Sequence, residues 1–376
     1  MALRILVVVQ GYPSPNDRYN LAYVHTRLLG YIARGLEVTV LNFGARSNYV
    51  YEGVPVISES HWLKVMTPYD VLIAHAPNLR NHLRFLQKHG SVFPRWLFFF
   101  HGHEVLNKQA YYPAPYDYDT GSSSFWRIAD RAYDFFKLRV LRPVLEKWLQ
   151  QGHLELIFVS GWMRQAFFDN VKARPELVMP HAHIIPNAVH PTFLSHQWQA
   201  LSPHNADCIT IRPLDNPKYA IDQVCVLARA NPQLRFHIFG RGEYFQHHLL
   251  PPNVVWFNRF LTPEEMIHLL PRYRCAVMPT RLDAQGVMMC ELASYGIPLI
   301  TSDLPICREM LAPFERVHYL PERLDAPNTQ IPENYKLQSI IESLAEAPSP
   351  HQQPFAFDTL IDQEYACITQ ESTSTS

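Results

Sequence analysis

The stretch that decides the fold reads PTRLDAQGVMMCELASYGIP, residues 279–298. Asp283 falls in a polar loop that follows an apolar run, and Gly286 permits a tight turn before helical spacing begins at Val287. Glu291 then lies about one turn inside the predicted helix. A helix N-terminus offers unpaired N–H groups and partial positive charge, which suit a phosphate, while flanking carboxylates suit sugar hydroxyls. The stretch therefore predicts a nucleotide-sugar site.

The length and composition predict a globular protein of two domains. A chain of 376 residues is too long for one ordinary core. Hydrophobic residues make up 47% and charged residues 18%, and the formal net charge is only −1, which argues against nucleic acid as a partner.

The chain is expected in the cytoplasm. Its first apolar run, residues 5–9, is too short for a secretion signal, and no run approaches the roughly 18 apolar residues of a membrane span. The six cysteines contain no Cys-x-x-Cys pair and lie mostly in apolar runs, so reduced, packed thiols are the simplest account.

Short β-branched or aromatic runs alternate with helical segments in both halves, which is the pattern of an α/β fold with doubly wound parallel sheets. The predicted strands of the first half are 4–9, 37–43, 71–75, 96–101 and 156–160, and a strand followed by a turn over 182–189 closes it. Those of the second half are 208–211, 235–239, 254–257, 275–278 and 298–301. We therefore predict domains at 1–196 and 197–350. Residues 351–376 supply a final amphipathic helix over 355–369 and a frayed tail.

The motif in the opening stretch resembles the signature of the GT4-like group of retaining glycosyltransferases (glycosyl transferases group 1). An acid is followed by seven residues, a Glu, a small residue and Gly-x-Pro; the first acid is usually Glu, and here it is Asp283. The resemblance implies the GT-B architecture, in which two Rossmann-like domains face each other across a cleft that holds the ligand. It also implies that the final helix packs back onto the first domain.

Two basic residues follow the first strand of the second half. Departure of a nucleoside diphosphate needs fixed positive charge where negative charge develops, and Arg212 and Lys218 are the candidates. Their spacing resembles the family loop that clamps the pyrophosphate, although this chain has Ile211 where Gly often precedes the arginine.

The resemblance assigns further donor contacts. Glu291 is expected to hold the ribose hydroxyls, and Asp283 to contact the donor sugar with backbone N–H groups from residues 284–287. The donor-binding residues expected in the second half are Glu291, Gly286, Val287, Gln285 and Gly240. Gly240 begins a Gly-Arg-Gly turn that is similar to the family's turn near the base, although a plain turn is about as good an account.

In the first half, His101-Gly102-His103 follows an aromatic strand and resembles the family's histidine-glycine element at the sugar end of the cleft. His101 is expected to orient and polarise the sugar or leaving phosphate. His75 is a weaker candidate. Gly11 stands where many members carry paired glycines near the donor phosphate, and residues 13–23 are an alternative source of acceptor contacts.

The resemblance implies retention of anomeric configuration, without a cofactor or divalent metal. The sequence agrees, because it shows neither an Asp-x-Asp pair near a strand end nor a compact His/Cys cluster. Residues 126–150 are aromatic and basic, so peripheral contact with the inner face of an anionic membrane is one hypothesis. Ordinary domain surface is the simpler one, because Pro143 is expected to interrupt this helix.

These observations favour a glycosyltransferase that moves a hexose-type sugar from a UDP- or GDP-sugar to a glycan acceptor, most simply a lipid-linked one. A non-catalytic subunit that binds glycan is the first alternative, although such proteins commonly lose the acids or the basic pair that this chain keeps. A nucleotide-sugar epimerase is a lesser alternative, since its elimination chemistry requires carboxylates in another arrangement.

Overall fold

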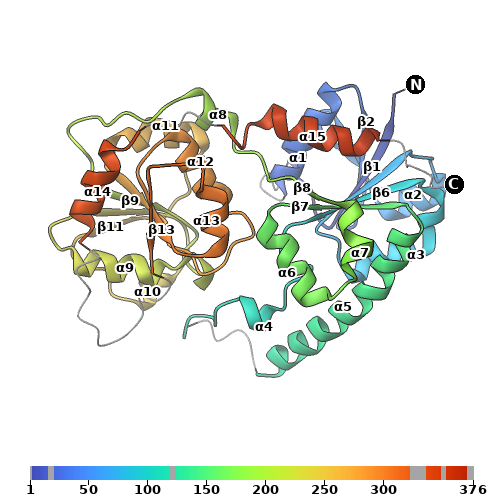
Figure 1. Cartoon of the computed structure of the whole chain (residues 1–376), viewed down its shortest axis with the longest axis horizontal. Helices are drawn as coiled ribbons and strands as arrows, with labels where there is room; N and C mark the ends of the chain where they lie inside the picture. The colour runs from blue at the N-terminus through green and yellow to red at the C-terminus, as the bar shows by residue number, and fades with distance from the viewer. Residues whose placement is uncertain (1, 16–20, 119–123, 322–335, 349–352, 371–376) are drawn as a thin grey trace. The chain divides into compact units, whose positions relative to one another are not determined.

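The computed structural model describes residues 2–15, 21–118, 124–321, 336–348 and 353–370. The chain forms two compact units (Figure 1). The amino-terminal unit contains residues 1–108, 129–187 and 358–376, and the carboxy-terminal unit contains residues 109–128 and 188–357. The sequence predicts divisions after residues 196 and 350, whereas these units change after Asn187 and Phe357. The predicted tail after residue 370 and residues 16–20 of the predicted acceptor segment lie outside the described residues.

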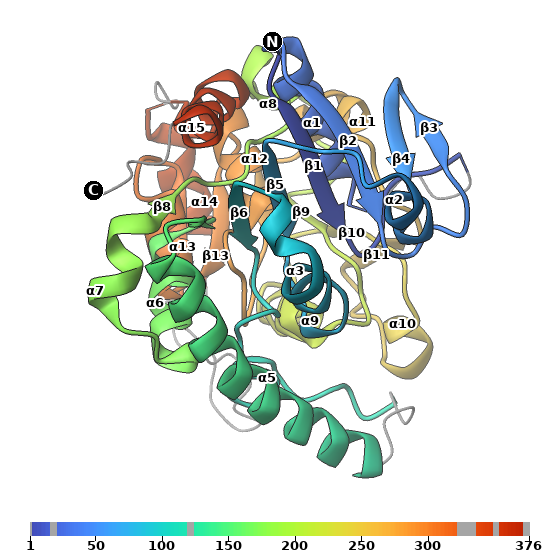
Figure 2. The ribbon, with the colours of Figure 1, turned by 90° about the vertical axis from the view of Figure 1, so that its right-hand side faces the viewer.

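The amino-terminal unit is built on an eight-stranded sheet in the order β3-β4-β2-β1-β5-β6-β7-β8. Its strands are β1 (Arg4–Val9), β2 (Glu37–Asn42), β3 (Tyr49–Tyr51), β4 (Val54–Ile57), β5 (Val71–His75), β6 (Arg95–Phe100), β7 (Leu154–Phe158) and β8 (Ala182–Ile184). All pairings are parallel except that of β3 with β4. Figure 2 shows β2, β1, β5 and β6 side by side. The apolar runs that predicted these central strands are buried, which confirms the parallel sheet.

The edge hairpin β3–β4 was not predicted from the sequence. Its strands are only three and four residues long, and Pro55 interrupts the apolar pattern of β4. The helices of this unit are α1 (Ala22–Ala33), α2 (Glu59–Val65), η1 (Leu79–Leu83), α3 (Arg84–His89), η2 (Gly90–Val92), most of α5 (Ser124–Gln150), α6 (Gly161–Val171), α7 (Pro175–Val178), η3 (Met179–His181) and α15 (Phe357–Thr369).

Helix α5 runs through Pro143, so the predicted interruption is wrong. Pro143 and Arg139 are both exposed, and the Arg139 carbonyl that loses its N–H partner can therefore reach water. Phe135 and Phe136 are 60% and 61% exposed, but Lys137 of the predicted basic face is buried. No helix among the described residues has the length and apolar character needed to cross a membrane.

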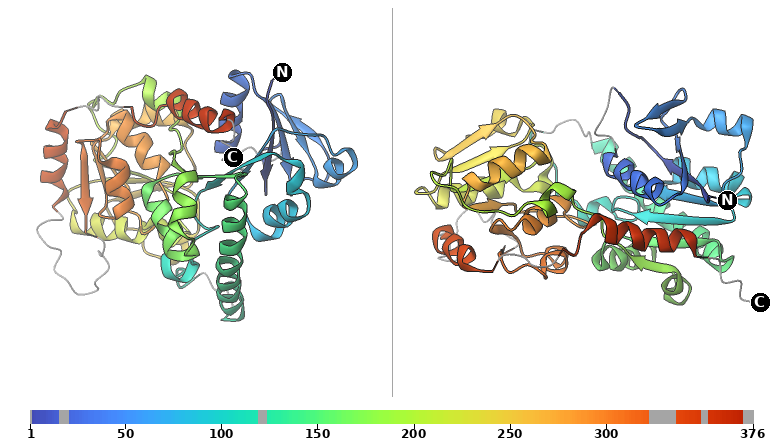
Figure 3. Two further views of the ribbon diagram at one scale, coloured as in Figure 1. Left: turned by 45° about the vertical axis from the view of Figure 1, so that its right-hand side comes forward. Right: turned by 90° about the horizontal axis from the view of Figure 1, so that it is seen from above.

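A buried ion pair joins α15 to α1, which lie beside each other in Figures 1 and 3. Arg27 Nε donates to Glu364 Oε1 at 2.7 Å, and the Tyr31 hydroxyl donates to Glu364 Oε2 at 2.5 Å. Arg27 also donates to the Asn187 side chain at 3.1 Å. Because both charges are removed from water, each depends on the other for compensation.

Replacing Glu364 with Gln is expected to lower the free energy of unfolding by about 3–5 kcal/mol, because the buried Arg27 charge then lacks its counter-ion. Asp362→Asn is the matched control, since Asp362 pairs with Arg34 on the exposed side of the same helix and should change stability by at most about 1 kcal/mol. Urea unfolding of the full chain, with m-values compared, measures both. Equal losses in the two variants would contradict the assignment.

The carboxy-terminal unit has a six-stranded parallel sheet in the order β11-β10-β9-β12-β13-β14. Its strands are β9 (Cys208–Ile211), β10 (Phe236–Phe239), β11 (Val254–Phe257), β12 (Cys275–Val277), β13 (Leu299–Ser302) and β14 (Val317–Leu320). Five of the six match predicted strands. Strand β14 was missed because its burial is only partial and His318 breaks its apolar pattern.

Helices cover the sheet of the carboxy-terminal unit. They are α8 (Pro191–Ser195), η4 (Pro217–Tyr219), α9 (Ile221–Ala230), α10 (Tyr244–His247), α11 (Pro263–Leu269), η5 (Leu270–Arg272), α12 (Val287–Tyr295), α13 (Pro305–Leu311) and α14 (Leu337–Glu346), and α4 (Lys108–Tyr111) begins one residue before this unit. One core cluster joins α9 and α14 to strands β9, β10, β12, β13 and β14. The carboxyl ends of β9 and β12 therefore share one edge of the sheet, where the predicted Arg212 and Asp283 follow them.

Candidate active site

Arg212 follows β9 directly and is 4% exposed. One of its terminal nitrogens donates to the Met278 carbonyl at 3.4 Å, and its guanidinium carbon lies 5.2 Å from the centre of the Tyr219 ring. Nε is buried and has no hydrogen-bond partner among the described residues. Burial lowers the pKa of Arg212, and the nearby Asp283 carboxylate opposes that shift. A buried cation with an unsatisfied donor is costly unless an anion binds beside it.

Lys218 lies in the loop that Arg212 begins, at the centre of the short helix η4. Its ammonium nitrogen is 4.6 Å from the centre of the same Tyr219 ring. Both predicted cations therefore lie against the Tyr219 ring, and the negative face of the ring partly compensates their charge. The structure brings together the two residues that the sequence predicts as a phosphate clamp.

Gly240 is required where β10 passes this loop. A Cβ at residue 240 would lie 1.7 Å from the Arg212 carbonyl oxygen, a distance that no side chain can occupy. The Arg212 N–H in turn donates to Phe239. The structure therefore gives Gly240 a definite role, in the close approach of two backbones, whereas contact with a nucleotide base stays a prediction.

The loop between β12 and α12 is closed by Asp283. Its Oδ1 accepts the N–H groups of Ala284 at 2.9 Å and Gln285 at 3.3 Å. These two N–H groups, which the resemblance assigns to the donor, thus bond to Asp283 in this structure. No hydrogen bond from a described residue to Asp283 Oδ2 accompanies these two, so Oδ2 is the oxygen left for the predicted contact with the donor sugar.

Gly286 sets the start of α12 with a left-handed backbone, φ 77° and ψ 56°. A Cβ there would also lie 2.2 Å from the Met289 methyl group. Glycine is thus needed for both conformation and space. The turn leaves Val287 as the first residue of a nine-residue helix whose N-terminal dipole favours an anion.

Glu291 is on α12, where burial raises the pKa of its carboxyl to about 7. The His190 N–H donates to Oε1 at 3.2 Å and opposes that shift. Near neutral pH the free site therefore holds a mixture of protonated and ionised Glu291. The hydroxyl groups of a ribose donate hydrogen bonds to carboxyl oxygens, and these bonds are strongest when the carboxyl is ionised.

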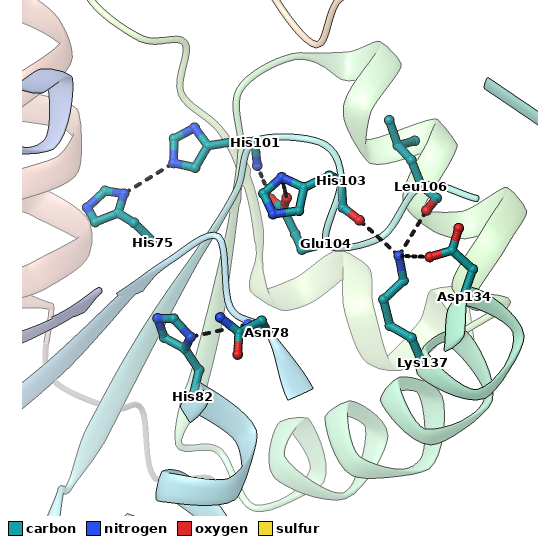
Figure 4. Close-up of polar contacts among 9 residues, drawn as sticks. All are labelled: His75, Asn78, His82, His101, His103, Glu104, Leu106, Asp134 and Lys137. Atoms are coloured by element: carbon teal, nitrogen blue, oxygen red, sulfur yellow. Dashed lines mark hydrogen bonds and ion pairs between the residues drawn. The ribbon is translucent and has the colours of Figure 1, made fainter. Parts of the chain in front are cut away.

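In the amino-terminal unit, His101 follows β6 and pairs with His75 of β5 (Figure 4). His75 Nδ1 and His101 Nε2 are 3.2 Å apart. Burial lowers the pKa of both imidazoles well below the ordinary value, and the Arg27 charge adds to the shift. Both rings are therefore neutral at physiological pH.

The environment of His75 indicates which nitrogens carry protons. Within the described part of the chain, His75 Nε2 is buried without a hydrogen-bond partner, and an unpaired buried acceptor is tolerated better than an unpaired buried donor. We therefore assign the proton of His75 to Nδ1, so that it donates to His101 Nε2. His101 then carries its own proton on Nδ1 and offers a neutral hydrogen-bond donor.

The loop after His101 is held by Lys137, a residue not predicted to act here. Its ammonium donates to the carbonyls of His103 and Leu106 and to Asp134 Oδ1, at 2.9, 3.0 and 2.8 Å (Figure 4). The His103 side chain is exposed. Gly11 lies two residues after β1 at the carboxyl edge of the same sheet, and its contact with the donor phosphate stays a prediction.

Comparison with known proteins identifies the class. Residues 209–325 match the family model described as Glycosyl transferases group 1. Sucrose-phosphate synthase from Thermosynechococcus elongatus superimposes with a TM-score of 0.68 at 13% identity, over 97% of this chain and 98% of that one. The chain is a glycosyltransferase of the GT-B type. The motif match lies in the carboxy-terminal unit, which carries the predicted donor residues.

Other structures agree in fold with this glycosyltransferase. HepE from Anabaena, solved with UDP and glucose, has a TM-score of 0.61 at 13% identity, and the match covers 98% of this chain and 100% of HepE. The trehalose-6-phosphate structure from E. coli, bound with UDP-2-fluoro glucose, has a TM-score of 0.58 at 10% identity, over 98% and 99%. Among curated proteins, none matches the chain by sequence.

The glycosyltransferase also has an open cavity of about 450 Å³ beside the loop that carries Lys218. It is lined by Pro113, Pro115, Pro213, Asp215, Asn216, Pro217 and Arg241. Proline rings with a few polar side chains can contact both the faces and the hydroxyls of a sugar. The sequence did not predict residues 113 and 115 at this place, because they follow the first-half motif at His101 and carry no motif of their own.

Replacing Glu291 with Gln is expected to separate stability from binding. A carboxyl whose pKa is raised by folding makes stability fall as pH rises from about 4.5 to 7, so Glu291→Gln should melt higher than wild type at pH 8. Wild-type affinity for an intact UDP-sugar should fall about tenfold from pH 8 to pH 6, because about a tenth of the carboxyl is ionised at pH 6.

Calorimetric titration at both pH values, with melting curves, measures these effects. The variant should bind weakly and show a flat pH profile, whereas the control Glu342→Gln, changed at an exposed position on α14, should follow wild type. A variant that keeps the wild-type pH profile would remove Glu291 from the donor site.

Proposed function

We propose that this glycosyltransferase is a retaining, metal-independent hexosyltransferase that uses a UDP- or GDP-sugar and a glycan acceptor. The observation that carries the proposal is the buried Arg212, whose Nε has no partner in the part of the chain that the structure describes. The Tyr219 ring lies against both Arg212 and Lys218. Such a site is poorly compensated when empty and well suited to a diphosphate. HepE and the E. coli trehalose-6-phosphate structure were solved with UDP or a UDP-sugar, which supports testing UDP-sugars first.

The proposed chemistry breaks the bond between the anomeric carbon and the β-phosphate oxygen. Negative charge then grows on the departing diphosphate, where Arg212, Lys218 and the N-terminus of α12 supply fixed positive charge. Two protein cations can do for the leaving group what a divalent metal does in other enzymes. This is the basis for proposing that transfer needs no metal.

The remaining groups are assigned to the rest of the donor. Ionised Glu291 accepts hydrogen bonds from the ribose hydroxyls, and Asp283 Oδ2 accepts one from the transferred sugar. In the amino-terminal unit, His101 offers a neutral Nδ1–H donor, which can bind an oxygen of a sugar or phosphate without adding net charge. Asp283 reaches one methylene less far than the Glu usual at this position, which affects the sugar hydroxyl selected.

The acceptor hydroxyl attacks the anomeric carbon from the side that the leaving group vacates. Its proton passes to the departing phosphate oxygen, so the new bond forms on the same face and the configuration is retained. For the acceptor we propose a lipid-linked glycan that meets the enzyme at the cytoplasmic face of a membrane. The exposed Phe135, Phe136 and Arg139 of α5 offer apolar and basic contacts for that surface.

The test is thermal stabilisation of the full chain by UDP-, GDP-, ADP- and dTDP-sugars in EDTA, since a ligand that binds only the folded state raises the melting temperature. We expect a shift with UDP- or GDP-sugars that persists in EDTA. Arg212→Ala and Lys218→Ala should each weaken that binding by about ten- to hundredfold, the value of a hydrogen bond to a charged group.

Lys218→Ala serves as a second variant because Lys218 is half-buried, so its removal should leave the fold intact even if Arg212→Ala does not fold. Binding that appears only after Mg²⁺ or Mn²⁺ is added would overturn the metal-independent mechanism. Full affinity in Lys218→Ala would overturn the assignment of the diphosphate site. An axial-or-equatorial assignment of the product by NMR would decide retention once an acceptor is in hand.

A further inference from the structure

Arg281 ties the loop that carries Lys218 to the loop that carries Asp283. Its backbone N–H donates to the Lys218 carbonyl at 2.8 Å, and its side chain donates to the Pro217 carbonyl at 2.9 Å. The Thr280 hydroxyl donates to the same Lys218 carbonyl at 2.9 Å. Three hydrogen bonds therefore fix two consecutive carbonyl groups of the Lys218 loop.

Asp222, in the first turn of α9, holds the Arg281 side chain in place. The carboxylate and guanidinium form a two-pronged ion pair at 2.9 and 2.5 Å. Asp222 Oδ1 also accepts the Tyr116 hydroxyl at 3.0 Å, from a segment that precedes the unit's sheet by about ninety residues. A planar guanidinium bound through two of its nitrogens has little conformational freedom, so it links the two loops rigidly. We call this arrangement of Arg281 and Asp222 the Arg281 bracket.

The geometry explains why Arg281 acts through another residue. Its charge is compensated by Asp222, and its donors are shared with the Pro217 carbonyl, so it has less to offer a phosphate than Arg212 or Lys218 has. What it controls is the backbone from which the Lys218 side chain extends. A lysine on a mobile loop would lose more conformational freedom when it binds a diphosphate, and affinity would fall accordingly.

We propose that Arg281 is a positioning residue for the leaving diphosphate, that it is held by Asp222, which Tyr116 bonds in turn, and that it acts through Lys218. The inference rests on the proposed role of Lys218 in binding the donor. The inference assigns a role to the arginine that lies two positions before Asp283, the first acid of the motif. The Arg281 bracket connects the two catalytic loops within a single unit, so it can be tested by binding alone.

The chain offers a closely matched control on the other side of strand β12. Arg274 directly precedes β12, at the amino edge of the sheet, and pairs with Asp207 at 3.2 Å. The side chains of Arg274 and Arg281 are 25% and 19% exposed, so Arg274→Gln and Arg281→Gln remove similar half-buried ion pairs. Only the second pair touches the Lys218 loop.

The experiment measures the affinity of each variant for UDP and GDP by calorimetry, together with its melting temperature. Arg281→Gln should weaken binding of the preferred nucleotide about three- to tenfold, the effect of leaving one long side chain to be ordered on binding. Arg281→Lys, which keeps the charge but cannot form the bidentate pair with Asp222, should give an intermediate loss of affinity. Arg274→Gln should lower the melting temperature similarly and leave affinity unchanged.

A double-variant cycle separates positioning from a general structural effect. In the Lys218→Ala background, Arg281→Gln should cause little further loss of affinity, because the group it positions is gone. Additive losses, or equal losses of affinity in Arg274→Gln and Arg281→Gln, would overturn the proposal. If the wild type binds neither nucleotide, the proposed function fails; if it binds and Arg281→Gln matches it, only the role of Arg281 fails.

Discussion

The need to compensate a buried guanidinium, that of Arg212 at the carboxyl end of β9, constrains the residues around it in the carboxy-terminal unit. Arg212 is surrounded by protein, yet no described residue bonds its Nε, so its surroundings must compensate a charge that they do not fully bind. The Tyr219 ring, the Met278 carbonyl and the Asp283 carboxylate each supply part of that compensation. Gly240 allows a neighbouring strand to pass within contact of the same residue. The positions of these groups follow from one ion that folding has removed from water.

The amino-terminal unit compensates Arg27, one of its buried cations, differently. Arg27 is paired with Glu364 and bonded to Asn187, so its charge is locally balanced. Its field still reaches the paired imidazoles of His75 and His101, whose pKa values it helps to lower. One unit thus leaves a buried cation incompletely paired among the described residues, while in the other unit burial, with the field of Arg27 added to it, keeps two histidines uncharged.

Most of the architecture and part of the site could be predicted from the sequence, for identifiable reasons. Buried parallel strands such as β6 are continuous apolar runs, and Asp283, Gly286 and Glu291 lie within nine residues of each other, so short-range spacing is enough to relate them. The Arg281 bracket could not be predicted in this way. Its partners Asp222 and Tyr116 are brought together only by the fold, and the one signal was an arginine just before the motif. Lys137 was misjudged because helical periodicity does not show which cations turn inward to bond a loop.

The order in which the chain visits its units limits how the molecule can be divided. The polypeptide changes unit after residues 108, 128, 187 and 357, so neither unit is one continuous segment. Tyr116 bonds Asp222 in the carboxy-terminal unit although it is encoded between two parts of the amino-terminal one. A single cut near residue 190 would therefore yield fragments that each lack a piece of their own core. An exchange of one unit between related enzymes, in the laboratory or in evolution, would have to join the chain correctly at several crossings at once. This favours gradual change within an intact chain over recombination of its halves.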